Sequence, residues 1–313
     1  MSPDRAAGGP GASPRPTLSA QLREDIAGYL FIAPWLVGFL VFTAGPFVAS
    51  FVLSLLDTDM ISHFDFVGPG NYVKLANDKI WWTSLYNTVF LAVFGLSTNM
   101  VLGLAVALLL NEKLVGMRLF RTVFYLPAVV SGVAVFLIWI TIFDYDYGLL
   151  NTIIGLFGLE PHQWLTSEQW VKPSMILMGW WGVGSGVLLY LAGLNAIPRE
   201  LYEASELDGA DRPRRFRHVT LPMLSPTIFF VFLTGLIGSL QIFIGPLVMT
   251  GGGPNYSSIT VVLFLYNNGF RYFKMGYASA IAWTLFLLIA GLSYLVFRSS
   301  SAWVYYEGEL RGK

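Results

Sequence analysis

The sequence predicts an all-α protein that crosses a membrane with six transmembrane helices. Of its 313 residues, 55% are hydrophobic and only 12% are charged, whereas soluble domains carry about 25% charged residues. Several long intervals contain no Asp, Glu, Lys or Arg at all. Most of the basic residues fall on one side of these intervals, as expected for cytoplasmic loops. A polytopic membrane protein explains all three observations, and a soluble fold explains none of them.

Each predicted span is an interval without charged side chains, which are costly in the hydrocarbon core. These intervals are 26–56, 80–111, 122–143, 173–198, 218–270 and 275–297. A crossing helix needs about 20 apolar residues, so the fifth interval is too long for one span. Its turn-forming stretch "TGGGPNYSS", 250–258, divides it into a span near 221–248 and the segment "ITVVLFLYNNGF", which is too short to cross.

The distribution of Lys and Arg predicts the orientation of the chain. One side holds five of the nineteen, and the other side holds the remaining fourteen; the five are Lys74, Lys79, Lys172, Arg271 and Lys274. The side with more basic residues is cytoplasmic, so both termini and the loop between the fourth and fifth spans are expected inside. We expect a disordered cytoplasmic tail at 1–25, a transmembrane domain at 26–298 and a cytoplasmic tail at 299–313.

Composition and motifs exclude several kinds of chemistry. The chain has no cysteine, which excludes disulfides and thiolate chemistry, and its net charge of zero gives no field that attracts nucleic acid. The phosphate-cradling pattern G-x-x-x-x-G-K-[ST] does not occur. No catalytic residue and no metal ligand set is predicted, because the nearest acidic pair, Asp144 and Asp146, is more typical of a solvated turn.

The connection between the fourth and fifth spans, 199–220, is a charged island between apolar stretches. Pro198 and Glu203 suit the first turns of a helix, and Gly209 suits its end. A second short helix is expected from about Arg212 to His218, before Pro222 opens the fifth span. A basic loop that only sets topology is the alternative interpretation, but such a loop needs neither a small-residue helix face nor a glycine at a fixed place.

The island resembles the EAA loop of permease subunits in binding-protein-dependent ABC importers. The pattern is Glu-Ala-Ala, three residues, Gly, nine residues, Ile, any residue and Leu-Pro. Its positions are occupied here by Glu203, Ala204, Ser205, Gly209, Val219, Leu221 and Pro222. Ser205 replaces the second Ala and Val219 replaces Ile, and both changes are mild.

Further stretches are similar to the carbohydrate-importer branch of that family, from about 27 to 297. They are "FVGPGNYVKL", "SLYNTVFL", "RLFRTVFYLPAVVSGVAVFLIW", "DYGLLN" and "LVMTGGGP". The resemblance implies a type I, MetI-like permease that moves a sugar by alternating access, with glycerol phosphate as an alternative substrate. It implies four kinds of partner: a second permease, two ATPase subunits that bind ATP and Mg²⁺, an external sugar-binding protein and membrane lipid.

The resemblance also assigns a role to the island, which would dock on an ATPase subunit as a rigid coupling element. Ala204 and Ser205 would allow close approach, Glu203, Asp208 and Asp211 would pair with basic groups, and Gly209 would supply the bend. Leu221 and Pro222 complete the motif. No cofactor is expected on this chain, because ATP hydrolysis would reside on the partner subunits.

Two stretches inside the spans are candidates for the substrate path. In "GWWGVGSGVLLY", 179–190, Trp180 or Trp181 would stack on a sugar ring, with Gly182 and Ser185 nearby. The glycines at 179, 182 and 186 equally suit close helix packing. In "GSLQIF", Ser239 and Gln241 lie in an apolar helix. They would contact substrate or form interhelical hydrogen bonds. Asn87, Asn99 and Asn195 are weaker candidates.

Two other functions compete with the permease interpretation. A secondary transporter driven by protons usually carries ionisable residues inside its spans, and the six intervals contain no Asp, Glu, Lys or Arg. The same observation leaves sodium coupling open. A membrane-embedded enzyme needs clustered His, Asp or Cys, whereas His63, His162 and His218 fall in predicted loops.

Overall fold

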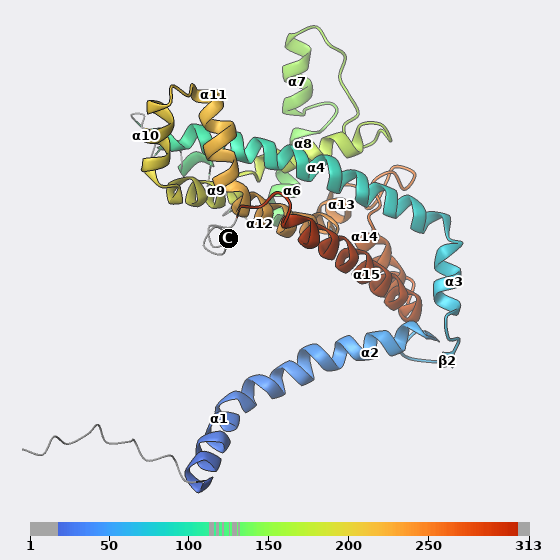
Figure 1. Ribbon diagram of the computed structural model, residues 1–313. Helices are drawn as coiled ribbons and strands as arrows, with labels where there is room; N and C mark the ends of the chain where they lie inside the picture. The colour runs from blue at the N-terminus through green and yellow to red at the C-terminus, as the bar shows by residue number, and fades with distance from the viewer. Residues whose placement is uncertain are drawn as a thin grey trace, which may run out of the picture. The chain divides into compact units, whose positions relative to one another are not determined.

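A computed structural model describes residues 18–112, 116, 119, 120, 122–124, 126, 130 and 132–305, with no side-chain description before Leu22 or at Ser185. The described part is built of helices apart from one two-stranded hairpin (Figure 1). The chain divides into two compact units, 1–52 and 53–313, and each is described separately.

The first unit is a single long apolar helix. It consists of α1 (Leu18–Phe39), the wide π-helical turn η1 (Leu40–Ala44) and α2 (Gly45–Ser54). Leu22–Ser54 is long and apolar enough to cross a membrane, which confirms the first predicted span. The wide turn lets Gly45 N–H reach the Leu40 carbonyl five residues back, just before Pro46, which has no N–H to donate.

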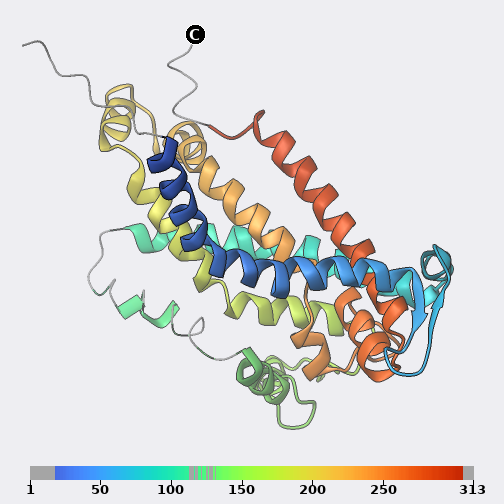
Figure 2. The ribbon, with the colours of Figure 1, turned by 90° about the horizontal axis from the view of Figure 1, so that it is seen from below.

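Three long helices and one bent pair form the centre of the second unit. The long helices are α4 (Lys79–Asn111), α12 (Leu221–Ser239) and α15 (Met275–Ser300), and the pair is α8 (Val171–Trp181) with α9 (Gly184–Ala196). Helix α4 packs against α8, α9 and α12 (Figure 2). Leu110, Tyr190 and Leu224 are fully buried where α4, α9 and α12 meet.

The fourth predicted span is not one straight helix as expected, because α8 and the main part of α9 meet at an angle of 49°. At the break, Gly182 N–H bonds to the Gly179 carbonyl three residues back, which is a tighter turn than an α-helix has. Glycine weakens a helix interior by about 1 kcal/mol relative to alanine. The repeated glycines therefore account for the position of the break.

The third and fifth spans also differ in detail from the prediction. Helix α6 (Gly132–Ile142) covers the second half of the interval 122–143, and much of the first half lies outside the described residues. The second short helix of the island is not separate, since α11 (Arg212–Arg215), η2 (Phe216–Thr220) and α12 form one continuous helix, 212–239. The wide turn η2 precedes Pro222 and absorbs its missing N–H, so the helix continues.

Among the described residues, four helices are long and apolar enough to span, and the bent pair makes a fifth candidate. With α6 in the third predicted interval, the arrangement agrees with a six-span fold in outline. The shorter elements of the second unit connect these helices. They are β1 (Leu56–Thr58), β2 (Phe64–Phe66), α3 (Gly70–Ala76), α7 (Leu149–Leu156), α10 (Arg199–Leu207), α13 (Ile244–Met249), α14 (Val261–Tyr266) and η3 (Asn267–Arg271).

The "TGGGPNYSS" stretch and the short segment after it are held by buried polar groups of α4. Asn87 Nδ2 donates to the carbonyl oxygens of Tyr256 (2.8 Å) and Ile259 (3.0 Å), and Thr88 Oγ1 accepts from Val261 N–H (2.9 Å). The segment after the break forms only α14 and η3, which confirms that it is too short to cross. Asn87 therefore has the structural role expected for a weaker candidate.

Candidate functional site

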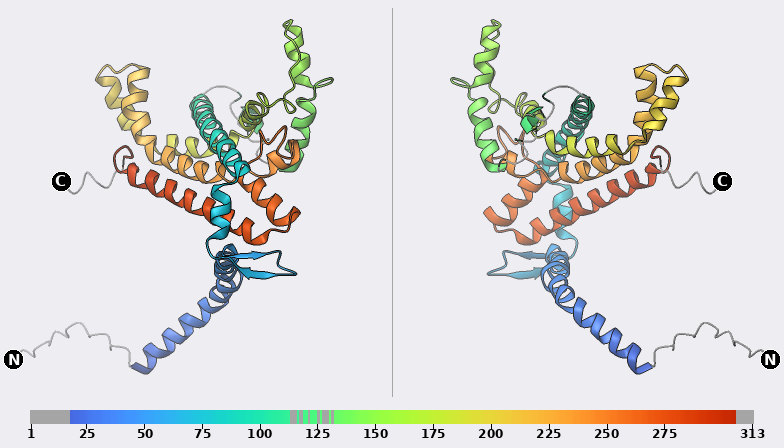
Figure 3. Two further views of the ribbon diagram at one scale, coloured as in Figure 1. Left: turned by 90° about the vertical axis from the view of Figure 1, so that its right-hand side faces the viewer. Right: turned by 90° about the vertical axis from the view of Figure 1, so that its left-hand side faces the viewer.

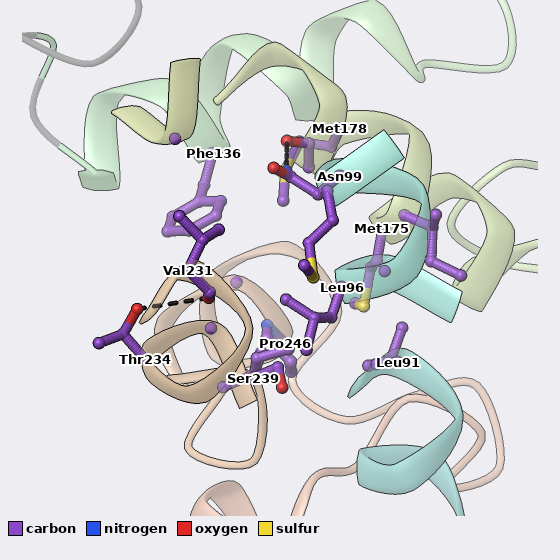
Figure 4. Close-up of a pocket in the computed structure, with 18 of the residues that line it drawn as sticks. Leu91, Leu96, Asn99, Phe136, Met175, Met178, Val231, Thr234, Ser239 and Pro246 are labelled. Atoms are coloured by element: carbon purple, nitrogen blue, oxygen red, sulfur yellow. Dashed lines mark hydrogen bonds between the residues drawn. The ribbon is translucent and has the colours of Figure 1, made fainter. Parts of the chain in front are cut away.

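A cavity of about 580 Å³ lies among the helices of the second unit (Figure 4). This volume falls within the range of about 300–1,000 Å³ typical of small-molecule sites. Its walls come from α4, α6, α8, α9, α12 and α13 and from Ile242, so residues from 91 to 246 meet around it. The lining residues used below are Asn99, Met100, Phe136, Met175, Met178, Thr234, Ser239 and Pro246.

Three uncharged polar side chains line the cavity, and each is held by a backbone carbonyl. Asn99 Nδ2 donates to the Gly179 carbonyl oxygen at 3.0 Å, which links α4 to α8. Thr234 Oγ1 donates to the Phe230 carbonyl oxygen at 2.7 Å, and Ser239 Oγ donates to that of Leu236 at 3.0 Å. Methionine, leucine, isoleucine, valine and phenylalanine side chains make up most of the remaining wall.

The structure brings one of the predicted substrate-path side chains, Ser239, into the cavity wall. Trp180 donates from Nε1 to Thr98 Oγ1 at 3.1 Å, and Trp181 packs edge-to-face on Trp139 with ring centroids 6.2 Å apart. Both tryptophans are half exposed and lie outside the wall, although the neighbouring Gly179 belongs to it.

Gly182 ends α8 at the break, and Gln241 Nε2 donates to the Ile237 carbonyl at 2.9 Å within its own chain segment. The side chain of Ser185 lies outside the described residues. Neither Ser239 nor Gln241 makes the interhelical hydrogen bond that was the alternative interpretation. The roles of these residues in transport therefore stay predictions.

The glycines at 179, 182 and 186 do not serve close helix packing against the described residues. A Cβ atom on Gly179 or Gly186 would meet no heavy atom within 4 Å, and one on Gly182 would meet only the Gly179 carbonyl. Gly179 and Gly186 instead line the cavity. Their missing side chains leave space there, because larger residues would project into it.

The charged island forms two short helices joined at Gly209, with α10 first and α11 second (Figure 1). Gly209 has φ of +75°, a conformation that only glycine adopts without strain. Ala210 N–H bonds back to the Ser205 carbonyl at 2.9 Å and closes α10. Asp211 then caps α11 by accepting from Arg214 N–H at 3.0 Å.

The island is fastened to the start of the fifth span by side chains. Tyr202 and Thr220 share a hydrogen bond of 3.1 Å between their hydroxyl groups, and Glu206 pairs with Arg215. The opposite side of α10 is exposed, with Glu203 and Ala204 on it, and Leu207 is 90% exposed at its end. Figure 3 shows that this pair of helices stands clear of α7. A partner can therefore reach α10 without disturbing the contacts to α12.

Asp208 closes α10, and its N–H donates to the Ala204 carbonyl at 3.0 Å. Leu221 and Pro222 lie in the first turn of α12, directly after the wide turn η2. All the motif positions thus lie on one continuous path from α10 to α12. Within the part of the chain that the structure describes, no group of three or more His, Asp or Glu side chains could hold a metal ion.

Sequence reasoning did not identify most of the cavity wall. Thr234, Phe136 and the three methionines 100, 175 and 178 are ordinary residues of apolar helices in the sequence. Asn99 was considered only as a weaker candidate. The signal that could have found Asn99 and Thr234 is their polar character in otherwise apolar spans, but many such residues are structural.

Comparison with known proteins agrees with this arrangement. Residues 99–304 match the family described as "Binding-protein-dependent transport system inner membrane component". The chain is 36% identical over 300 residues to the probable ABC transporter permease protein YesP of Bacillus subtilis, covering 93% of this chain and 96% of that protein. It is 38% identical over 280 residues to the lactose transport system permease protein LacF of Rhizobium radiobacter, covering 87% and 93%.

A solved structure shares the fold. A chain of a bacterial ABC transporter involved in the import of the acidic polysaccharide alginate matches with a TM-score of 0.80 and 22% identity, covering 91% of this chain and 98% of that one. Because the family match covers most of the chain and the relatives align over nearly their whole length, this chain belongs to the inner-membrane permease components of binding-protein-dependent ABC importers.

Proposed function

We propose that this permease carries a sugar or oligosaccharide through the membrane. ATP hydrolysis by partner ATPase subunits would drive this transport by moving the α10–α11 island. The observation that carries the proposal is the geometry of the island, whose exposed α10 is fastened to the spanning helix α12. A displacement of α10 is transmitted to α12 because Tyr202 and Glu206 of α10 bond to Thr220 and Arg215, and these two residues belong to the continuous helix 212–239 that contains α12. Such a rigid connection is what a coupling element needs.

The sugar part of the proposal is supported by the relatives. They include the arabinooligosaccharides transport system permease protein AraP of Bacillus subtilis, 33% identical over 290 residues, as well as the lactose permease component LacF. The cavity supports the same substrate class, since its size and its mixture of apolar wall and uncharged polar groups suit a sugar ring. Glycerol phosphate is less favoured, because the described residues that line the cavity include no cationic side chain.

The proposal requires partners. A second permease, two ATP-binding subunits that hold ATP and Mg²⁺, and an external sugar-binding protein would complete the importer, and lipid would surround the apolar helices. A solved relative of the same fold is described in complex with a pentasaccharide-bound periplasmic protein. The cavity would open alternately to the outside and to the cytosol while the ATPases cycle.

The first test is ATP-driven uptake. The permease would be co-purified with its partner subunits, reconstituted in proteoliposomes with the external binding protein, and supplied with radiolabelled neutral and acidic saccharides and glycerol phosphate. We expect uptake of a saccharide that depends on ATP and on the binding protein. Uptake that persists without ATPase subunits would contradict the proposal.

The second test concerns orientation, which the basic residues predict. Because the chain has no cysteine, single-cysteine variants can be labelled without background. Arg214→Cys in the island should react only with a membrane-permeant maleimide in intact cells. Ile61→Cys, at an 81% exposed position between β1 and β2, is the matched control and should react with an impermeant one. The reverse pattern would exclude a cytoplasmic island.

A further inference from the structure

We infer that the cavity selects an uncharged saccharide whose hydroxyl groups donate hydrogen bonds to Asn99, Thr234 and Ser239, and that it excludes acidic sugars and phosphate esters. The inference rests on the proposed function, because it assumes that this cavity holds the transported molecule. It goes further by naming the charge class of the substrate and the residues that set it.

Three of the four polar hydrogen atoms on the side chains of Asn99, Thr234 and Ser239 are already engaged. The hydroxyl groups of Thr234 and Ser239 have one hydrogen each, and both hydrogens point to backbone carbonyls. One of the two amide hydrogens of Asn99 bonds to the Gly179 carbonyl. What these side chains still offer is mainly acceptor capacity, namely Asn99 Oδ1 and the free lone pairs of the two hydroxyl oxygens. A sugar hydroxyl can donate to such groups, whereas an ionised carboxylate or a dianionic phosphate group has no hydrogen to donate.

The described cavity wall contains no positive charge that would offset an anion. None of its residues is Lys, Arg or His. Lys172 is the nearest cation along α8, one turn before Met175 and Ile176, but its Nζ is 3.1 Å from Asn87 Oδ1 and lies over the rings of Tyr86 and Phe90. The ammonium group is thus already occupied outside the wall.

The start of α13 does not supply an anion site either. Gly245 and Pro246, near the N-terminal end of α13, line the cavity. Pro246 has no N–H, and the N–H of Leu247 donates to the Phe243 carbonyl at 3.0 Å. An anion entering the cavity would therefore lose its hydration without meeting a cation in the described wall, which is a large penalty in an apolar surrounding.

The remaining wall favours the apolar face of a sugar. Met100, Met175 and Met178 all line the cavity. Phe136 lies across the cavity from Met175 and Met178 (Figure 4). Thioether and phenyl groups pack well against the C–H groups of a sugar ring, and methionine adapts to different shapes. The fold match to the alginate transporter does not bear on this point, since a likeness of fold carries no information about the chemistry of the wall.

The test uses two probes that differ only in the group at C6 of the sugar ring. p-Nitrophenyl β-glucoside has a CH₂OH group where p-nitrophenyl β-glucuronide has a carboxylate. Binding of each to the assembled permease–ATPase complex in nanodiscs, without the external binding protein, is measured by equilibrium dialysis. We expect the glucoside to bind at least about tenfold more tightly, because the carboxylate would be buried without a partner. Equal or tighter binding of the glucuronide, or binding of neither probe, would overturn the inference.

Variants of the wall sharpen the result. Thr234→Val and Asn99→Leu remove acceptors at similar size and are each expected to weaken glucoside binding by about five- to tenfold, since a sugar hydroxyl loses its partner. Lys172→Met is the matched control outside the wall and should leave the ratio between the probes unchanged. If the Lys172→Met variant no longer binds the glucuronide, the lysine binds the anion in the unmodified protein, and the inference would be overturned. Co-purification of the ATPase subunits verifies the assembly of each variant.

The inference and the proposed function fail in different ways. ATP-driven uptake of acidic saccharides in preference to neutral ones would retain the importer and refute the neutral cavity. Absence of uptake for every saccharide, with assembly intact, would refute the sugar importer itself.

Discussion

The α10–α11 island and the cavity differ in how their residues are brought together. The island is a continuous stretch of the chain, 199–220, and its bonds are local: Gly209 bends it, Asp211 caps α11, and Glu206 pairs with Arg215. The cavity is assembled from six helices and is mainly apolar, and the polar side chains among its described lining residues carry hydroxyl or amide groups. The comparison teaches that the island is encoded by local geometry, whereas the cavity is encoded by tertiary packing. Substitutions in the two regions should therefore fail in different assays.

The largest effect is expected from Gly209→Val. A β-branched residue at φ of +75° is strained by about 1–3 kcal/mol, which would unwind the end of α10 and change the angle between the two helices. We expect uptake to fall more than about tenfold while ATP hydrolysis continues. The distorted island would no longer transmit the movement of the ATPase subunits to α12.

Gly158→Val is the matched control for backbone strain. Gly158 has φ of +73°, and, as at Gly209, a Cβ atom would meet nothing within 4 Å, but it follows α7, away from the island. This variant should retain coupled uptake. Equal loss of coupling in both variants would mean that strain anywhere in the molecule, rather than at the island, causes the effect.

Leu207→Asp tests the exposed side of α10. Leu207 is 90% exposed, and an apolar side chain at this position is explained if it enters a groove on an ATPase subunit. A buried carboxylate in that interface would weaken assembly by about tenfold, measured as the fraction of ATPase subunit that co-purifies. Leu156→Asp in α7, which is 82% exposed, should leave assembly unchanged, and a similar loss there would argue against a specific contact at α10.

Gly186→Leu tests whether the cavity holds the substrate. No heavy atom lies within 4 Å of a Cβ at Gly186, and the residue lines the wall, so a leucine side chain would fill part of the space that substrate needs. We expect uptake to fall about fivefold with normal ATPase assembly, since filled volume competes directly with ligand. Gly291→Leu in α15, also without close neighbours and outside the wall, should transport normally.

Trp181→Ala should have a smaller effect than Gly186→Leu. Trp181 lies outside the wall, and its edge-to-face contact with Trp139 joins the α8 end to α6. Such aromatic contacts contribute about 0.5–1.5 kcal/mol, so uptake should fall about threefold without loss of assembly. A loss as large as that of Gly186→Leu would place the indole in direct contact with the sugar. Unchanged uptake kinetics would reject both roles.

The two regions also show what sequence alone can reveal. The spans follow from charge-free intervals, and the island follows from glycine, proline and capping residues, because each of these acts on its own neighbours in the chain. The break at Gly182 and the continuous helix through Pro222 were missed. Whether a glycine or proline breaks a helix depends on whether one irregular turn can replace the lost hydrogen bonds. Residue composition does not determine this. Asn99 of α4 and Thr234 of α12 line the same cavity only after folding, so no local pattern distinguishes them from other polar residues in a span.

The smallest effect is expected from the cap of α11. Asp211 accepts a hydrogen bond from Arg214 N–H at 3.0 Å, and loss of such a cap costs about 1 kcal/mol. Asp211→Ala should therefore increase hydrogen exchange at the first turn of α11 by about fivefold and reduce uptake only slightly, because Tyr202 and Thr220 still fasten α10 to the same helix. Asp211→Asn restores a capping oxygen and should restore protection. If asparagine fails where aspartate succeeds, the charge is needed, which would indicate that Asp211 pairs with a basic group of the ATPase subunit in addition to capping the helix.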